Sequence, residues 1–380
     1  MANLAQYLFQ RAQANPESIA IIDKTVKTNE PERPPQMALH GYGAAELRFS
    51  EFAARIKRLA GGLTALAQTS HGDRVVICME NRPEFFDLLF ACWTAGLCPV
   101  PVNAKLHPKE VVHILRDCDA RVAFLSGRLA PDITAALADS EHKVAVFATN
   151  QASFAALYEG ASMEPATVDP TELAWIFYTS GTTGRPKGAM LTHGNLFWNS
   201  ANTAYGEDFM GTTTLTCAPL FHIGGLNVTT LPSLARGIEV VLIRSFDAAE
   251  VLAALEKYQV STMFGAPTMF LMMSQHDSFA STDLSHIGAF VVGGAPVPVP
   301  LINLYSERDV RFCQGYGLTE TSPFATMLET SMALEKVGSA GRPPMFTDVR
   351  IVDGENNPLP AGEHGEVCVR GPNVLKGYWN

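Results

Sequence analysis

The sequence lacks the cysteine spacing of a zinc site or of a disulfide framework. Seven cysteines are scattered among 380 residues, no two of them form a CxxC pair, and most lie in apolar stretches. Zinc sites and redox motifs are usually built from closely spaced pairs, and a small disulfide-linked fold needs an even number of cysteines. We therefore expect buried, reduced thiols, which favours a cytoplasmic protein.

The chain also has no excess of positive charge and no uninterrupted hydrophobic segment long enough for a membrane span. Lysine and arginine number 28 against 38 aspartates and glutamates, which gives a net charge of −10. The longest apolar stretch, residues 85–102, contains an aspartate, a glycine and two prolines, and the first 14 residues lack the pattern of a signal peptide. We expect no nucleic-acid partner and no transmembrane segment. Only weak peripheral contact with a membrane is left open.

Regular alternation of strand and helix patterns predicts the fold class. Helical patterns cover residues 50–66, 84–95 and 108–118, and strand patterns cover 74–79, 97–102, 121–125, 238–243, 262–264 and 289–292. This alternation predicts an α/β fold with mostly parallel sheets covered by helices. Asp247 precedes one more helical pattern and is interpreted as its N-cap rather than as part of a specificity motif.

The length of the chain favours several sub-domains. We predict two stacked αβ sub-domains, over residues 1–168 and 169–330. Residues 331–380 are rich in short strand patterns and turn residues, and predict a small β-rich sub-domain, a distorted barrel. Residues 24–47 contain three prolines and are interpreted as a flexible surface insertion.

The most informative segment is Tyr178–Gly188, YTSGTTGRPKG, which combines four serine and threonine hydroxyls, three glycines and one lysine. The apolar run Leu173–Tyr178 before it predicts a buried parallel strand, and residues 192–204 after it predict a helix with Thr192 as N-cap. In a strand–loop–helix arrangement, backbone N–H groups converge on an anion. Hydroxyl donors and a lysine favour a polyphosphate.

This segment is not a P-loop, although its lysine fits one. Counted from Gly181, Lys187 takes the lysine position, but Pro186 replaces the second glycine and Gly188 replaces the hydroxyl residue that binds Mg²⁺. Proline has no N–H to donate, and glycine has no side chain to coordinate a metal. A phosphate-binding loop of another kind is predicted, with a solvated turn as the alternative.

Three further motifs are hard to explain by packing alone. They are Gly293-Gly-Ala-Pro296, Gln314-Gly-Tyr-Gly-Leu-Thr-Glu320 and Gly365-Glu-Val-Cys-Val-Arg-Gly-Pro372. Together with YTSGTTGRPKG, in this order and over about residues 4–380, they resemble the adenylate-forming superfamily. Gly338–Arg342 and Met345–Val349 are most similar to bacterial fatty-acyl-CoA synthetases.

The resemblance implies an AMP-forming acid–thiol ligase. A carboxylate attacks the α-phosphate of ATP with Mg²⁺ bound, pyrophosphate leaves, and the thiol of coenzyme A then displaces AMP from the acyl-adenylate. The implied catalytic residues are Lys187, His222, Thr319 and Glu320, with Glu320 as the metal ligand. The implied nucleotide contacts are Thr179, Ser180, Gly181, Thr182, Thr183, Gly184, Lys187, Gly293, Gly294, Ala295, Pro296, Gln314, Gly315, Tyr316, Gly317 and Thr319. The implied substrate contacts are His222, Phe264, Gly265, Ala266 and Gly293.

The same resemblance bears on which acid is activated. Amino-acid-activating relatives usually carry Phe-Asp where this chain has Phe221-His222, so a substrate ammonium would stay unpaired here. By the same resemblance, residues 263–273 line part of the acyl pocket, which lies with the phosphate loop in the second sub-domain, 169–330. These residues are apolar, rich in methionine and free of arginine, which favours a medium- to long-chain fatty acid over a diacid. An aryl or hydroxycinnamic acid is the alternative. Taken singly, His222 also fits a satisfied core histidine, Tyr316 a buried tyrosine and Glu320 a surface acid.

The family usually continues past the segment that ends in Gly377-Tyr-Trp379, into a mobile lid that carries the adenylation lysine. We therefore expect these 380 residues to correspond to the large N-terminal domain, with low or no turnover on their own. The rival hypothesis is a non-catalytic nucleotide- or acyl-binding module. A phosphotransferase is less favoured because no second metal-binding acid is found. A monomer or a homodimer is expected.

Overall fold

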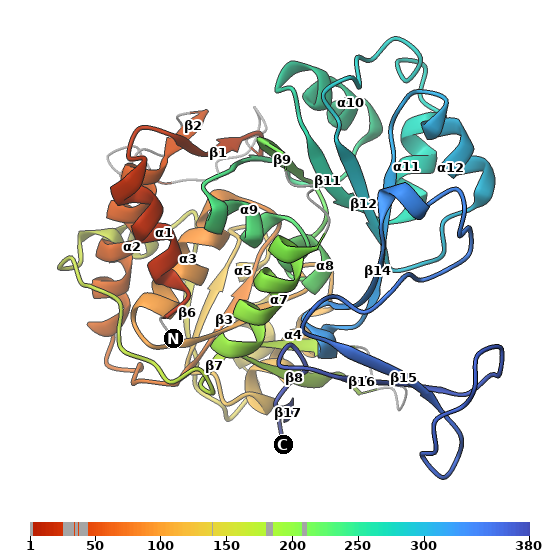
Figure 1. Ribbon diagram of the computed structural model, residues 1–380. Coiled ribbons are helices and arrows are strands. Elements are labelled where there is room, and N and C mark those ends of the chain that lie inside the picture. Colours follow the sequence, from red (N-terminus) through yellow and green to blue (C-terminus); the bar gives the residue numbers. More distant parts are fainter. Residues whose placement is uncertain are drawn as a thin grey trace.

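The computed structural model describes residues 3–25, 34, 37, 45–138, 140–179, 185–206 and 211–380. Two sheets with helices against their faces account for most of this part of the chain (Figure 1). The predicted α/β class with mostly parallel sheets is confirmed. Ser180, Gly181, Thr182, Thr183 and Gly184 of the predicted phosphate loop lie outside the described residues.

The first sheet is parallel throughout and has the order β4-β3-β5-β6. Its strands are β3 (Arg74–Cys78), β4 (Cys98–Val102), β5 (Val122–Leu125) and β6 (Ala145–Ala148). The helices that accompany it are α2 (Phe49–Thr64), α3 (Pro83–Thr94), α4 (Pro108–Asp117), α5 (Ala130–Ala138) and α6 (Ala152–Ala155). A 3₁₀ turn, η2 (Ala156–Glu159), follows α6. Val75 and Ile77 pack into the core that contains α2 and α3, whereas Val76 and Cys78 pack into the core that contains α4 and α5. A strand buried on both faces is apolar at every position, which is why the sequence identified these strands.

The second sheet has eight strands in the order β14-β13-β12-β11-β9-β10-β1-β2. Their bounds are β1 (Ile19–Asp23), β2 (Glu46–Arg48), β9 (Thr213–Thr216), β10 (Glu239–Leu242), β11 (Thr262–Gly265), β12 (Ala289–Gly293), β13 (Phe312–Gly317) and β14 (Phe324–Leu328). Only the two edge strands, β2 and β14, pair antiparallel. The accompanying helices are α1 (Ala5–Ala14), α8 (Ile223–Asn227), α9 (Thr230–Arg236), α10 (Ala248–Lys257), α11 (Pro267–Ser274) and α12 (Val299–Ser306). Asp247 caps α10 as expected, because its carboxylate accepts a hydrogen bond from the Glu250 amide.

Strands β1 and β2 connect the beginning of the chain to this second sheet. The predicted division at residue 168 stays a prediction, but any such division cuts across the eight-stranded sheet. The interpretation of residues 24–47 as a surface insertion stays a prediction. Of its described residues, Leu47 in β2 and Met37 are buried, whereas Lys24 and Glu46 are exposed. Most of this segment lies outside the described residues.

The phosphate-loop motif lies in a hairpin, which corrects the predicted strand–loop–helix arrangement. Strand β7 (Leu173–Thr179) pairs antiparallel with β8 (Lys187–Thr192), and β17 (Gly377–Tyr378) adds to the other side of β8. Helix α7 (His193–Tyr205) starts only after β8, with Thr192 as its N-cap, as predicted. The alternating pattern of β8 is short and begins with Lys187-Gly188, so pairing with β7 and β17 determines its conformation.

Strands β15 (Asp348–Val352) and β16 (Glu366–Arg370) form a separate antiparallel pair, and the sheets of the described residues include no closed barrel. Short 3₁₀ turns, η3 (Thr319–Thr321) and η4 (Thr330–Met332), precede and follow β14. All seven cysteines are free thiols, and six are buried, as expected. Among the described helices, none combines the length and apolar character needed to cross a bilayer.

Candidate active site

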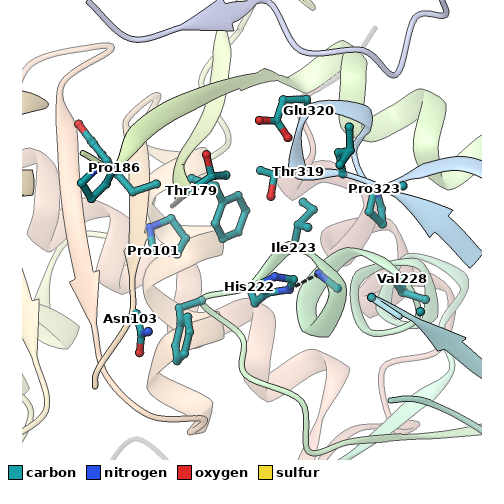
Figure 2. A pocket seen from close by; sticks show the side chains of 18 of the residues that line it. Pro101, Asn103, Thr179, Pro186, His222, Ile223, Val228, Thr319, Glu320 and Pro323 are labelled. Carbon is teal, nitrogen blue, oxygen red and sulfur yellow. Dashed lines mark hydrogen bonds between the residues drawn. The ribbon is translucent and has the colours of Figure 1, made fainter. Parts of the chain in front are cut away.

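One cavity of about 780 Å³ brings together motifs that are far apart in the sequence. Its walls come from the β7–β8 hairpin, the residues after β4, the segment before α8, and the ends of β11, β12 and β13. Figure 2 shows Thr179, His222 and Thr319 around the same space, with Pro101 and Asn103 on one side of it. The cavity therefore lies where several parallel strands end, the usual place for a ligand in an open α/β sheet.

The hairpin contributes Thr179 and Lys187 directly opposite each other. They are paired across β7 and β8, and the Thr179 hydroxyl donates a hydrogen bond to the Lys187 carbonyl at 3.5 Å. The Lys187 side chain is exposed, and its Nζ lies 5.5 Å from the centroid of the Tyr378 ring. Both predicted residues line the cavity, and the ammonium is available to an anion there.

Thr319 and Glu320 lie on the tight turn η3, which several hydrogen bonds hold in place. The Leu318 amide donates to the Thr321 hydroxyl at 2.9 Å, and the Asn373 side chain donates to the Thr321 carbonyl at 2.8 Å. A Cβ at Gly317 would lie 1.7 Å from the carbonyl oxygen of Pro323, so only glycine fits. This motif glycine is required by the turn itself, and the turn positions Thr319 and Glu320 at the cavity wall.

Glu320 is the carboxylate of this wall that can hold a cation. Its Oε1 accepts a hydrogen bond from the Tyr378 hydroxyl at 2.7 Å, and this bond to the carboxylate raises the pKa of Tyr378 to about 12. The described residues contain no cluster of three or more histidine, cysteine or acidic side chains that would form an all-protein metal site. The donor set fits Mg²⁺, which is commonly bound by one or two carboxylates together with substrate phosphates.

His222 lines the cavity and also caps helix α8. Its Nδ1 accepts a hydrogen bond from the Gly224 amide at 3.1 Å, drawn as a dashed line in Figure 2. Although the ring is open to the cavity, the protein atoms packed around it lower the pKa of His222 below its ordinary value. The neutral imidazole with Nδ1 as acceptor carries its proton on Nε2. His222 can thus donate a hydrogen bond from Nε2.

Part of the cavity lining is apolar and includes an aromatic ring. Gly224, Val228, Phe264, Pro323 and Phe324 belong to this part. A Cβ at Gly224 would lie 2.7 Å from the Phe264 ring, and a Cβ at Gly293 would lie 3.3 Å from it. The ring therefore lies between two glycines that leave space for it. No arginine occurs among the described residues that line the cavity.

The structure brings most of the described predicted site residues to the cavity, but not all. Those that line it are Thr179, Lys187, His222, Phe264, Gly293, Gly294, Gly315, Tyr316, Gly317, Thr319 and Glu320. Those outside the lining are Gly265, Ala266, Ala295, Pro296 and Gln314. Gly265 faces the buried Phe270 ring, and Gln314 is buried with an Nε2 that has no hydrogen-bond partner among the described residues.

The methionine-rich helix expected to form the acyl wall does not reach the cavity. Leu271 and Met272 on α11 are 43% and 54% exposed, and the buried residues of this helix pack against α12 and β12 instead. This corrects the use of its methionines as an argument for fatty acids. The apolar wall comes from α8, β11 and the residues around β14.

Sequence reasoning missed two parts of the wall. Asn103, Leu106 and Glu110 follow the carboxyl end of β4, and their place at the end of a parallel strand was a usable signal. Tyr378 gave no such signal, because its contact with Glu320 depends on β17 pairing with β8.

Comparison with known proteins assigns the family. A family model described as AMP-binding enzyme matches residues 8–379. The chain belongs to the AMP-binding enzyme family. The resemblance to the adenylate-forming superfamily is thereby confirmed.

Relatives of this AMP-binding enzyme include CoA ligases that are named for different carboxylic acids. It is 40% identical to the feruloyl-CoA synthase of Amycolatopsis sp over 356 residues, which are 92% of this chain and 70% of that protein. It is 33% identical to the long-chain-fatty-acid–CoA ligase FadD13 of Mycobacterium tuberculosis over 384 residues, covering 100% of this chain and 72% of that protein. The inhibitor-bound crystal structure of the N-terminal domain of FACL13 from Mycobacterium tuberculosis matches with a TM-score of 0.89 and 31% identity, over 100% of this chain and 92% of that one. Both acids that the sequence left open, a hydroxycinnamic acid and a fatty acid, thus occur in the names of relatives, and the comparison does not rank one above the other.

Proposed function

We propose that this protein activates an apolar monocarboxylic acid with ATP and Mg²⁺ and transfers the acyl group from the adenylate to coenzyme A. The observation that supports this most is the shared cavity. Its lining includes the polar residues Lys187, Thr319 and Glu320 and also an apolar part around Phe264. The proposed reaction needs both a polyphosphate site and an apolar acid site at one place.

The polar wall holds charge. Lys187 and the Thr179 hydroxyl bind the β- and γ-phosphates, which become the leaving pyrophosphate, and Thr319 donates to the α-phosphate. Glu320 would hold Mg²⁺, which when bound neutralises charge on the phosphates. Tyr316, 39% exposed, offers its ring to adenine beside Gly294. Positioning and neutralisation of this kind supply most of the catalysis in phosphoryl and nucleotidyl transfer.

His222 orients the acid. Its neutral ring donates from Nε2 to one carboxylate oxygen and leaves the other oxygen free to attack the α-phosphate. A protonated imidazolium would pair with the carboxylate and weaken it as a nucleophile, so the lowered pKa of His222 suits this role.

The apolar part of the lining selects the acid. The described lining has no arginine for a second carboxylate, and Phe221 is followed by His222 rather than by an acid that could pair with a substrate ammonium, so diacids and amino acids are disfavoured. The aromatic rings Phe264 and Phe324 provide flat surfaces for a hydroxycinnamic acid. The same apolar walls accept a medium- to long-chain fatty acid, which stays the second candidate through the similarity to FadD13.

The test is calorimetric titration with non-hydrolysable acyl-sulfamoyl adenosines, which mimic the adenylate and need no turnover. The acyl groups are feruloyl, decanoyl, palmitoyl and phenylalanyl, and AMP is the reference ligand. We expect the feruloyl or a fatty analogue to bind at least about a hundredfold more tightly than AMP, and the phenylalanyl analogue to gain far less. Equal binding of all four analogues and AMP would refute acid activation at this site. Acid-dependent ATP–pyrophosphate exchange with the preferred acid then measures the chemical step.

A further inference from the structure

Segment 372–379 joins the two halves of the phosphate wall. On one side, the Lys376 amide donates to the Met190 carbonyl at 2.9 Å and the Trp379 amide donates to the Gly188 carbonyl at 2.8 Å, which attaches the segment to the strand that carries Lys187. Figure 1 shows β17 beside β8 at this end of the molecule. The segment is therefore part of the same sheet as the hairpin.

On the other side, the segment holds the Glu320 turn. The Leu375 amide donates to the Glu320 carbonyl at 2.9 Å, and the Tyr378 hydroxyl donates to the Glu320 carboxylate at 2.7 Å. The Asn373 side chain donates to the carbonyls of Thr321 and Phe324 at 2.8 and 2.9 Å. Glu320 is thus held at its main chain and at its side chain by the same short segment.

Tyr378 contacts both Lys187 and Glu320, the two charged groups of the wall. Its hydroxyl is bonded to Oε1 of Glu320, and its ring lies under the Lys187 ammonium. Tyr378 lines the cavity and is 44% exposed, so packing alone does not account for its position. A carboxylate has several acceptor sites, and one donor on Oε1 fixes its orientation while Oε2 stays available to a cation.

We infer that Tyr378 is a positioning residue for the proposed adenylation site: its hydroxyl holds the Glu320 carboxylate in the orientation that binds the metal. This inference rests on the proposed function, because it requires a metal–nucleotide complex at Glu320. Hydrogen-bond partners that orient metal-ligating carboxylates typically contribute a factor of about 10 to 100 to metal affinity.

The experiment measures Mn²⁺ binding by electron paramagnetic resonance in the presence of α,β-methylene-ATP. Tyr378→Phe keeps the ring under Lys187 and removes only the hydroxyl. We expect its Mn²⁺ affinity to fall about tenfold or more, whereas binding of the nucleotide in EDTA stays within about twofold of the wild-type value. Tyr205→Phe is the matched control, since Tyr205 is 67% exposed, packs on Phe346 and does not line the cavity. Tyr378→Leu also removes the ring and should weaken nucleotide binding even in EDTA.

Each outcome bears on a different claim. Unchanged Mn²⁺ affinity in Tyr378→Phe would overturn the inference while leaving the proposed function intact. If Tyr378→Phe lost as much affinity for the nucleotide in EDTA as it lost for Mn²⁺, the inference would also be overturned. The hydroxyl would then support the whole wall rather than the metal ligand. If the wild-type chain binds no Mn²⁺ with the nucleotide, the proposed function fails and the inference fails with it.

Discussion

His193 should make the folded protein sensitive to acid, and the structure gives the size of the effect. The side chain is 3% exposed, lies at the first residue of α7 and packs beside the Trp93 ring. Burial lowers the pKa of His193 from 6.5 to about 4, and the nearby Glu172 opposes this only in part. The start of a helix disfavours a cation as well.

The sign of the effect follows from which state binds the proton. The unfolded chain protonates His193 near pH 6.5, whereas the folded chain resists protonation down to about pH 4. The free energy of unfolding is therefore highest, as far as His193 is concerned, above about pH 6.5, and it decreases as the pH falls from 6.5 to about 4. The difference in pKa corresponds to about 3 kcal/mol, a large part of the stability of an ordinary domain.

The assay is urea unfolding of the wild type and of His193→Asn between pH 7.5 and pH 4. Asparagine retains an acceptor where the His193 Nδ1 accepts from the Leu4 amide at 3.4 Å. We expect the wild type to lose about 3 kcal/mol more over this range than the variant. His364→Asn, at an exposed histidine, is the control and should follow the wild-type curve. If the free energy of unfolding fell equally with pH in the wild type and in His193→Asn, whatever the offset between the two curves, the reasoning would be refuted.

Two other predictions concern the acid pocket and the core. Gly224→Ala puts a methyl group 2.7 Å from the Phe264 ring, a steric cost of about 1–3 kcal/mol. The affinity for the preferred acyl-sulfamoyl adenosine should therefore fall at least about tenfold, while the affinity for AMP stays the same. Gly354→Ala, in open space, is its control, and equal affinities in the two variants would contradict the pocket assignment. Asp87→Asn neutralises a fully buried carboxylate 2.6 Å from the Arg55 guanidinium, so urea unfolding should show a loss of about 3–5 kcal/mol. A loss below about 1 kcal/mol would mean that the remaining contacts of Arg55 compensate.

The sequence was a good guide where local pattern and tertiary environment agree. Strand β3 is apolar from Val75 to Cys78 because both of its faces are buried, and α2 has its apolar residues on the face that packs in the core. Thr192 and Asp247 cap their helices through hydrogen bonds between near neighbours, so short-range spacing was sufficient to predict them. Motif residues such as Thr319 and Glu320 were found because the resemblance rests on local sequence.

Long-range pairing explains the errors. Strand β8 depends on partners from β7 and from the distant β17, so its own residues did not predict it. Helix α11 has the composition of a pocket wall, yet its buried side chains face α12, because orientation depends on how the helix packs. The role of Gly317 at the nucleotide stays a prediction, but no sequence pattern indicated that the carbonyl of Pro323 already excludes any side chain there. Tyr378 lies far along the chain from Glu320, so no local pattern could connect them.

The hairpin changes the physical explanation of the proposed phosphate binding. A helix dipole cannot supply it at Lys187, because α7 begins at His193, after the whole of β8. The described part of the wall then depends on the exposed Lys187 ammonium and on hydroxyl donors such as Thr179. Exposed charges are screened over about 8 Å at physiological ionic strength, so ATP affinity should fall with salt more steeply than AMP affinity. Lys187→Gln should weaken ATP about tenfold or more, leave AMP nearly unchanged and remove much of the salt dependence. An equal loss for ATP and AMP in fluorescence or calorimetric titrations would show that Lys187 supports the fold of the hairpin rather than the outer phosphates.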